Sequence, residues 1–192
     1  VPDDAGALQV NGGPVTAEFL RGEIDAEIAR NGGTASRTIV APGPQGAYPH
    51  ETGSGPIPAN VPVVIDVFPR VDRTGYWGDL TRTVVRGSAP DAVRRVYEAV
   101  REARDRTERK LRAGITGAGA HNFAAEILRD RGFETDQSAD PPSGFFHGLG
   151  HGLGLEIHEK PTLSTRNQEP LRPGNVVTVE PGLYYPEWGG VR

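Results

Sequence analysis

Apolar residues recur at helical spacing near the start of the chain. Thr16 is a potential N-cap, because its hydroxyl can accept a hydrogen bond from a backbone amide of the first turn. Gly32 and Gly33 mark the end, since glycine is common just beyond a helix C-terminus. The predicted helix carries its apolar side chains on one side, at Phe19, Leu20, Ile24 and Ile28.

Two further helices are predicted between residues 88 and 131. The first begins within residues 88–91, stops at Gly114, and has apolar positions at Val93, Val96, Val100 and Leu111. The second runs from about Gly119 to Arg131, with inward positions at Phe123, Ile127 and Leu128. The charged positions between residues 101 and 109 are most simply a solvated helix face.

A hairpin is predicted between residues 61 and 85. Residues 61–66 have the pattern of a buried strand, and residues 74–85 alternate. If the chain turns midway, at Asp72-Arg73, Asp66 and Asp79 are directly opposed, with Cβ atoms about 4.5–5.5 Å apart. Two carboxylates that close in an apolar sheet repel each other unless one is protonated or a cation lies between them. The alternative is that one aspartate is a turn or capping residue.

A third carboxylate follows the β-branched run of residues 176–179. This run predicts a buried strand, and Glu180 stands at its end. A lone ionised glutamate is unfavourable in such a place, and metal coordination would remove the penalty.

Three of the five histidines fall within a dozen residues of a glycine-rich segment, F-F-H-G-L-G-H-G-L-G-L-E-I-H-E, residues 145–159. Imidazole is the commonest protein metal ligand and a proton carrier near neutral pH, so His147, His151 and His158 indicate a reaction centre. Glycines at 148, 150, 152 and 154 allow a ligand or another strand to approach closely. The alternative is a glycine-rich loop with incidental histidines.

Together these segments offer an oxygen-rich ligand set with one nitrogen: Asp66, Asp79, His151 and Glu180. Such a set suits Mn²⁺, Co²⁺, Fe²⁺ or Zn²⁺, and carboxylates able to bridge suggest two metals. The chain has no cysteine, which excludes a disulfide scaffold and a zinc-thiolate site.

Composition narrows the function classes further. A chain of 192 residues is long enough for one domain with a sizeable core. Its net charge of −4 gives no basic footprint, so nucleic acid is not expected as a partner. No apolar run approaches a membrane span, so we expect no membrane partner. A place in the cytoplasm is a separate expectation, because an absent leader pattern shows little where the termini can be cut.

The ordered motifs I-D, G-Y-W-G-D-L-T-R-T, H-G-L-G-H-G-L-G-L-E-I-H-E and V-E-P-G-L-Y-Y-P resemble those of the pita-bread metallopeptidases, a superfamily that includes methionine aminopeptidase, aminopeptidase P and prolidase. The resemblance spans about residues 14–192 and favours the proline-directed branch. It implies an α+β pita-bread fold, a curved antiparallel sheet flanked by helices, in two halves related by a pseudo-two-fold axis.

The resemblance also implies a role for each site residue. Asp66 would chelate one metal, Asp79 would bridge two, and His151 and Glu180 would bind the second. A hydroxide activated by the two metals, Mn²⁺ first among the candidates, would attack the scissile carbonyl, and Glu180 would accept the water proton. His158 would contact the substrate carbonyl oxygen and His50 the leaving nitrogen. Further pocket residues would be His147, Tyr184 and Arg192. For His50, the residues alone favour a turn residue beside Pro49.

This sequence departs from the family pattern in two places. The spacing from Asp66 to Asp79 is two residues longer than in aminopeptidase P, which implies a longer hairpin tip. A fifth ligand, a bridging glutamate expected just after G-G-V-R, lies beyond Arg192. We therefore expect residues 1–192 to be a single catalytic domain truncated at both ends, with one helix and any amino-terminal domain upstream of Val1, and an incomplete metal site.

Three functions stay open at this stage. The leading one is a dinuclear metallopeptidase, an aminopeptidase or dipeptidase, acting on peptides with proline at the second position and forming a homodimer in the full-length protein. The second is a creatinase-like hydrolase of a small C–N substrate. The third is a non-catalytic binding module of the same shape, which predicts lost ligands.

Overall fold

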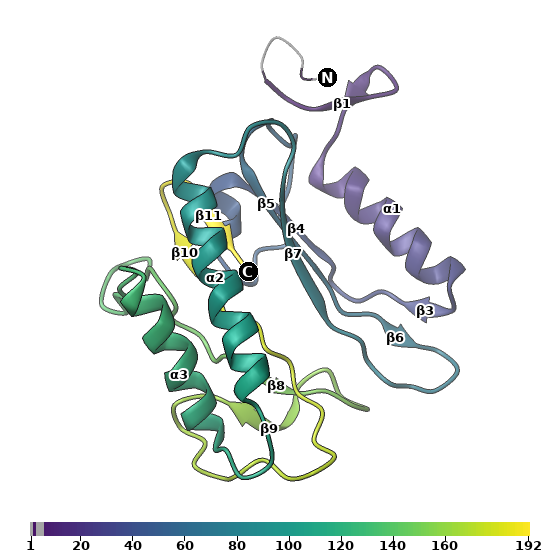
Figure 1. Cartoon of the computed structure of the whole chain (residues 1–192). Coiled ribbons are helices and arrows are strands. Elements are labelled where there is room, and N and C mark those ends of the chain that lie inside the picture. Colours follow the sequence, from purple (N-terminus) through teal and green to yellow (C-terminus); the bar gives the residue numbers. More distant parts are fainter. Residues whose placement is uncertain (1, 3–5) are drawn as a thin grey trace.

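Three α-helices and a set of short strands make up the described part of the chain (Figure 1). The structure, a computed structural model, describes residue 2 and residues 6–192. The helices are α1 (Ala17–Arg30), α2 (Asp91–Lys110), α3 (Gly117–Asp130) and the short 3-10 helix η1 (Gly43–Ala47). The strands are β1 (Gln9–Val10), β2 (Gly13–Pro14), β3 (Gly33–Thr34), β4 (Ile39–Pro42), β5 (Pro62–Val67), β6 (Arg70–Val71), β7 (Leu80–Val85), β8 (Gly150–Gly152), β9 (Glu159–Leu163), β10 (Leu183–Tyr185) and β11 (Gly189–Val191).

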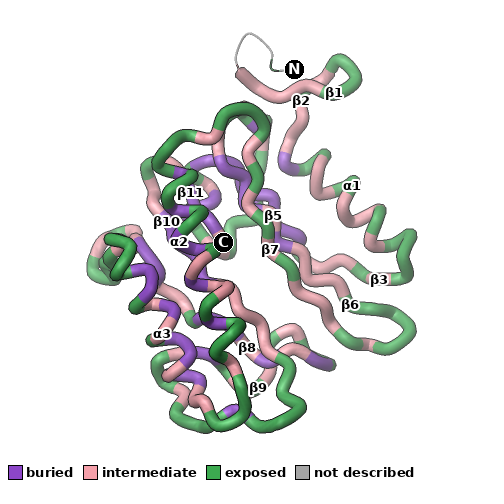
Figure 2. The backbone as a smooth tube through the Cα atoms, in the orientation of Figure 1, coloured by how far each residue is buried: buried purple, intermediate pink, exposed green. Residues whose placement is uncertain are grey.

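The strands confirm a mixed α+β architecture, but they do not join into one broad sheet. Among the described residues, β4, β5 and β7 form a three-stranded antiparallel sheet, and the pairs β1-β2, β3-β6, β8-β9 and β10-β11 are separate. Glycine and proline interrupt the smaller pairs, and the β8-β9 ladder shifts register between Gly150 and Gly152. Figure 2 shows buried stretches along β4, β5, β10, β11 and α3, while α1 is largely half-buried or exposed.

The hairpin between β5 and β7 turns one residue later than predicted. Asp66 is paired with Thr81, so the predicted direct opposition of Asp66 and Asp79 is wrong. The conformation of the hairpin tip sets this register. The amides of Thr74 and Gly75 both donate to the carbonyl of Val71, and Gly75 adopts a φ of 76°, which glycine allows without strain. A shift of two residues in pairing keeps every side chain on its face. Asp79 therefore lies diagonally from Asp66 on the same face.

Helix α1 begins as predicted. The Thr16 hydroxyl accepts a hydrogen bond from the Phe19 amide at 3.1 Å, and the helix ends at Arg30 before Asn31 and Gly32. Phe19 does not share the inward side, since 44 % of it is exposed. One residue is about 100° around a helix, so Phe19 is turned away from the stripe formed by Leu20 and Ile24, which pack against buried Val40 and Ile57.

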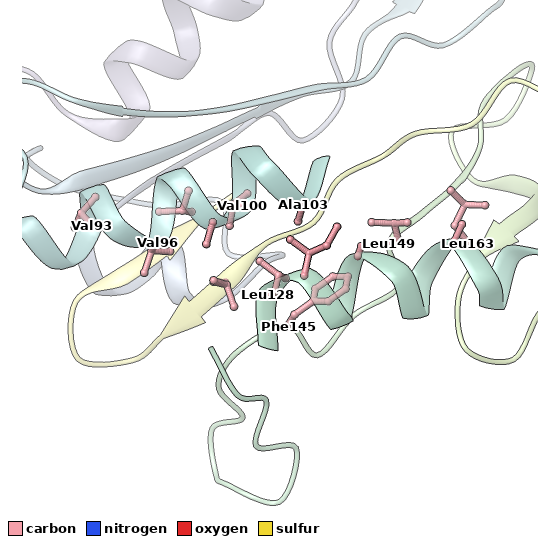
Figure 3. Packing of buried hydrophobic residues seen from close by; sticks show 14 of the residues in the cluster. Val93, Val96, Val100, Ala103, Leu128, Phe145, Leu149 and Leu163 are labelled. Carbon is pink, nitrogen blue, oxygen red and sulfur yellow. The ribbon is translucent and has the colours of Figure 1, made fainter. Parts of the chain in front are cut away.

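The main core lies between α2 and α3, as predicted from their apolar spacing. Figure 3 shows its members from α2, α3, the histidine segment and β9: Val93, Val96, Val100, Ala103, Leu128, Phe145, Leu149 and Leu163. Each fully buried aliphatic side chain contributes roughly 1.5–3 kcal/mol. Because Leu149 is fully buried and its amide donates to the Leu163 carbonyl, the core anchors the histidine segment.

The charged part of α2 is a solvated face, as predicted. Its ion pairs join exposed or half-buried side chains, such as Arg106 with Glu102 at 3.0 Å. In the described part of the chain, no helix has the length and apolar content that crossing a bilayer would require.

The run of residues 176–179 is not the buried strand that its composition predicts. Val176 is 63 % exposed, and residues 177–179 are half-buried. The run is nevertheless extended beside β8, because the amide of Thr178 donates to His151 and the amide of Glu180 donates to Leu149. Tertiary pairing along this one edge positions the run, and β-branched composition does not determine its burial.

Candidate metal centre

Asp79, His151 and Glu180 each bring one ligand atom into a group whose members all lie within 4.8 Å of one another. Nε2 of His151 is 3.0 Å from Oε1 of Glu180 and 3.5 Å from Oδ2 of Asp79. The three side chains come from the residue before β7, from β8 and from the extended segment before β10. Three parts of the chain therefore converge on one point.

The glycines of the histidine segment explain how β8 can approach its neighbours so closely. A Cβ atom on Gly150 would lie 2.1 Å from the Thr178 carbonyl oxygen, and one on Gly152 would lie 2.5 Å from the Lys160 carbonyl oxygen. Neither distance is possible for real atoms. Only glycine lets the backbone of His151 lie between these two segments, which confirms the predicted close approach at both positions.

Asp66 lies on the same face but is engaged differently. Its carboxylate forms an ion pair with the Arg192 guanidinium and accepts a hydrogen bond from the Thr81 hydroxyl at 2.8 Å. Burial raises the pKa of Asp66, although Arg192 and Thr81 oppose that rise. Asp66 is thus the one predicted ligand that is outside the close group of three.

The carboxylates of the group repel one another. Burial raises the pKa of Asp79 to about 7, and the charges of Glu180 and Asp66 add to that rise. For Glu180, burial also raises the pKa, but hydrogen bonding to His151, the charge of Arg192 and the Thr178 hydroxyl outweigh it and leave the pKa lowered. Glu180 is therefore ionised at neutral pH, and protonation of Asp79 relieves part of the repulsion.

The hydrogen bonds of His151 leave Nε2 as the ring nitrogen that could bind a metal. Its Nδ1 lies 3.0 Å from the Gly152 carbonyl oxygen, which can only accept, so Nδ1 carries the proton. When the ring is protonated, its Nε2–H donates to the ionised carboxylate of Glu180 at 3.0 Å, and loss of that proton would leave the Nε2 lone pair for a metal. Burial lowers the pKa of His151, but the hydrogen bonds to Glu180 and Gly152 and the negative charges of Glu180 and Asp79 outweigh burial, so the pKa is raised overall. An added cation would therefore displace a proton from this ring.

The donor set fits a divalent cation. One imidazole nitrogen and two carboxylates converge with side chains only 12–21 % exposed, and the acidic charge exceeds what His151 and Arg192 balance. Oxygen-rich sites with one nitrogen suit borderline divalent metals rather than thiophilic ones.

The group opens into a pocket of about 650 Å³. Eight of the predicted site residues line it: His50, Asp66, Asp79, His147, His151, His158, Glu180 and Arg192. Apolar walls come from Ile39, Phe68, Trp77, Phe146 and Ile157. This size and mixture are typical of a site for a small ligand.

Tyr184 is behind the pocket wall, where it is fully buried. Its hydroxyl lies 2.9 Å from Nε2 of His147, whose Nδ1 lies 2.6 Å from the Gly148 carbonyl oxygen. Nδ1 therefore carries the His147 proton, and Nε2 accepts from the tyrosine. Burial lowers the pKa of His147 to about 4 and raises that of Tyr184 to about 12, so both are neutral across the physiological range.

His158 and His50 are at the open side of the pocket, and both are exposed. The ring of His158 meets that of His151 edge to face, with centroids 4.3 Å apart. Burial lowers the pKa of His158, and the nearby imidazoles of His151 and His50 lower it further.

Two hydroxyl residues of the site were missed by the sequence analysis. Thr81 donates to Asp66, and Thr178 donates to Oε1 of Glu180 at 2.8 Å. The two-residue periodicity of an extended chain could have identified them. Thr81 is two residues after Asp79 and Thr178 is two residues before Glu180, so each threonine shares a face of the extended chain with that carboxylate.

Comparisons with known proteins show what the chain is similar to in sequence and fold. The family model for metallopeptidase family M24 matches residues 8–192 of the chain. A Xaa-Pro dipeptidase of Pyrococcus furiosus is 39 % identical over 156 residues, 81 % of this chain and 42 % of its relative. The solved prolidase of Pyrococcus furiosus has a TM-score of 0.85 at 35 % identity, covering 93 % of this chain and 51 % of that one. The solved X-Pro aminopeptidase of Thermotoga maritima has a TM-score of 0.84 at 34 % identity, covering 93 % of this chain and 49 % of that one. The chain thus spans about half the length of these relatives.

Proposed function

Because the chain belongs to metallopeptidase family M24, we propose that it hydrolyses the peptide bond before a proline at the second position of a peptide. The convergence of Asp79, His151 and Glu180 at the floor of a pocket with further histidines at its wall and mouth carries this proposal. The relatives described as Xaa-Pro dipeptidase and X-Pro aminopeptidase support the choice of substrate.

Two divalent cations would be held by Asp66, Asp79, His151 and Glu180, with Mn²⁺ first and Co²⁺, Zn²⁺ or Fe²⁺ as alternatives. Cations of this kind polarise carbonyl oxygens and make water more acidic. Asp66 would either turn from Arg192 toward a cation, or keep one carboxylate oxygen on Arg192 and offer the other to the cation.

The remaining residues bind substrate and move protons. Glu180, ionised at neutral pH, accepts the proton of the attacking water. His158 donates an N–H to the oxygen of the scissile carbonyl, and His50 faces the nitrogen of the leaving proline. His147 and Tyr184 stay neutral and shape the wall, and Arg192 holds the acidic side of the pocket in place.

The proposal is tested on the protein as encoded by its gene, first stripped of metal by a chelator. Adding Mn²⁺ should restore cleavage of a Xaa-Pro dipeptide or of a longer Xaa-Pro peptide, and the ratio of the two rates assigns dipeptidase or aminopeptidase. A matched peptide with alanine in place of proline is the control. Metal binding without cleavage of either substrate would contradict the proposal and favour a binding module, and cleavage of creatine alone would favour the creatinase-like alternative.

The expected homodimer, the cytoplasmic location and the pseudo-two-fold relation of two halves stay predictions. Light scattering of the encoded protein tests the first directly.

A further inference from the structure

Trp77 joins the β5–β7 hairpin to the segment that carries His158. Its backbone amide donates to the Gly154 carbonyl at 2.9 Å, and its indole Nε1–H donates to the Leu155 carbonyl at 3.1 Å. The two residues that accept are neighbours, so Trp77 holds one short stretch of backbone at two points. The same side chain lines the pocket.

Apart from the bonds to Trp77, the hydrogen bonds described for residues 154–158 are local, although Gly154 is buried and Ile157 is half-buried. The Gly154 amide bonds to the Glu156 carbonyl at 3.2 Å and the Glu156 amide to the Glu159 carboxylate at 3.2 Å, and both contacts are local. Leu155 is 60 % exposed, so its side chain provides no apolar anchor. A segment with few buried contacts and mostly local hydrogen bonds opens easily.

His158 depends on this segment for its position. Its ring is exposed and touches the His151 ring edge to face, and β9 begins at the next residue, Glu159. A small displacement of residues 154–158 would therefore move the His158 ring away from His151. Asp79 is two residues after Trp77, so the same hairpin fixes a candidate metal ligand and the His158 segment relative to each other.

We propose that Trp77 is a positioning residue that holds residues 154–158 through its indole hydrogen bond, so that the His158 ring stays against His151 at the mouth of the pocket. The catalytic consequence rests on the proposed function, whereas the structural statement does not. Trp77 would act on the reaction through His158 and would not bind metal.

The structural statement is tested by amide hydrogen exchange in wild type and Trp77→Phe, which keeps a ring and removes the indole N–H. Losing one hydrogen bond should speed exchange in residues 154–158 by roughly 3- to 10-fold. Leu155→Ala, which keeps the accepting carbonyl, and Tyr76→Phe on the exposed neighbour should leave it unchanged. Equal exchange in wild type and Trp77→Phe would overturn the proposal.

A measurement on the native side chain covers the case in which Trp77→Phe does not fold. The chain has two tryptophans, so Trp188→Phe assigns the Trp77 indole signal in a nitrogen-15 spectrum. A bonded indole proton should exchange at least several-fold more slowly than a free one. Exchange at the rate of free indole would show that the bond is not formed.

The catalytic consequence is tested by a double-mutant cycle with matched metal content. Trp77→Phe should lower kcat roughly 3- to 10-fold, and in the His158→Ala background it should have no further effect, because its target is already gone. An equal loss in both backgrounds would overturn the coupling. If metal-loaded wild type cleaves no Xaa-Pro peptide, the proposed function fails, and the exchange measurements still decide the role of Trp77.

Discussion

The guanidinium of Arg192 pairs with the carboxylate of Asp66, 126 residues earlier in the chain. Nε of Arg192 also bonds the Thr81 hydroxyl at 3.1 Å, so one side chain crosses the hairpin from Asp66 to its pairing partner. Burial would lower the pKa of Arg192, but Tyr184, Asp66 and Glu180 raise it, and the arginine is always charged. The acidic site thus contains one fixed positive charge, which pairs with Asp66. At Asp79, burial and the remaining repulsion from Glu180 and Asp66 raise the pKa.

Asp79→Asn should therefore abolish metal binding and peptide hydrolysis. The change removes one of three converging ligands and leaves an amide, which is a poor ligand for a divalent cation. Metal content by mass spectrometry and affinity by calorimetry measure the effect, with Asp72→Asn as the control, an exposed carboxylate of the same hairpin. Two tightly bound metals and normal turnover in Asp79→Asn would disprove the bridging role.

His158→Ala should keep its metal and lose rate. A group that supports the carbonyl oxygen or transfers a proton typically contributes about 10²–10³-fold to turnover. His50→Ala should behave similarly at the leaving nitrogen. Paired metal analysis and kcat separate the roles, because a variant that loses metal instead of rate would belong to the ligand set.

The metal-free protein should lose stability as the pH rises from about 4 to 7. The pKa of Asp79 is raised to about 7 by burial and by Glu180 and Asp66, from an ordinary value of 3.8, so the fold favours the protonated form. That contribution is complete below the ordinary value and is lost as pH passes the folded value. Each pKa unit corresponds to about 1.4 kcal/mol, so the loss is at most about 4 kcal/mol and is reduced by solvent screening at this partly exposed carboxylate.

Chemical denaturation of metal-free wild type and Asp79→Asn across this pH range measures the effect. The variant resembles the protonated side chain, so the difference in unfolding free energy between the two should grow with pH. A difference that does not change with pH would show that Asp79 titrates normally.

Gly150→Ala should destabilise the fold and weaken metal binding together. Its Cβ would lie 2.1 Å from the Thr178 carbonyl oxygen, so β8 must move from the segment that carries Glu180. Overpacking of this kind costs roughly 1–3 kcal/mol. Gly148→Ala is the matched control, with its nearest atom at 3.4 Å. Thermal denaturation of both variants should separate them, and equal midpoints would argue against the close approach.

His121 should make the protein less stable in mild acid. The side chain is buried on α3 against Phe145, with ring centroids 5.0 Å apart, and its Nδ1 has no hydrogen-bond partner in the described structure. Burial lowers its pKa, so its neutral form is favoured and stability is lost as pH falls below about 6.5. His121→Phe should remove this part of the pH dependence, as unfolding at pH 7.5 and pH 5 would measure. An unchanged slope would place the titration elsewhere.

The helices were predictable because their signals are local. A capping threonine at 16, an apolar stripe along α2 and the buried pair Ile127 and Leu128 depend on neighbours within a few residues. The exposure of Phe19 shows the limit, since an apolar residue next to a stripe is not part of it.

The hairpin register could not be predicted. Polar residues 70–74 give no signal that distinguishes one turn centre from the next, and the glycine conformation at position 75 decides it. The prediction that both aspartates share a face was nevertheless correct, because Asp66 pairs with Thr81, two residues from Asp79, and a shift of two keeps each side chain on its face.

The candidate site was predictable in its residue types but not in its connections. Carboxylates and histidines in apolar segments are conspicuous in a sequence, whereas the pairing of Arg192 with Asp66 depends on where segments far apart in the chain meet. The hydroxyl partners Thr81 and Thr178 also depend on that meeting.

The sequence separation of the site residues has a consequence for biosynthesis. A ribosome adds roughly 5–20 residues per second, so the carboxylate of Asp79 leaves it roughly 5 to 20 seconds before that of Glu180. During that interval the nascent chain lacks the third member of the group at positions 79, 151 and 180. Binding of a cation by this group of three would therefore be a late event in the maturation of the protein.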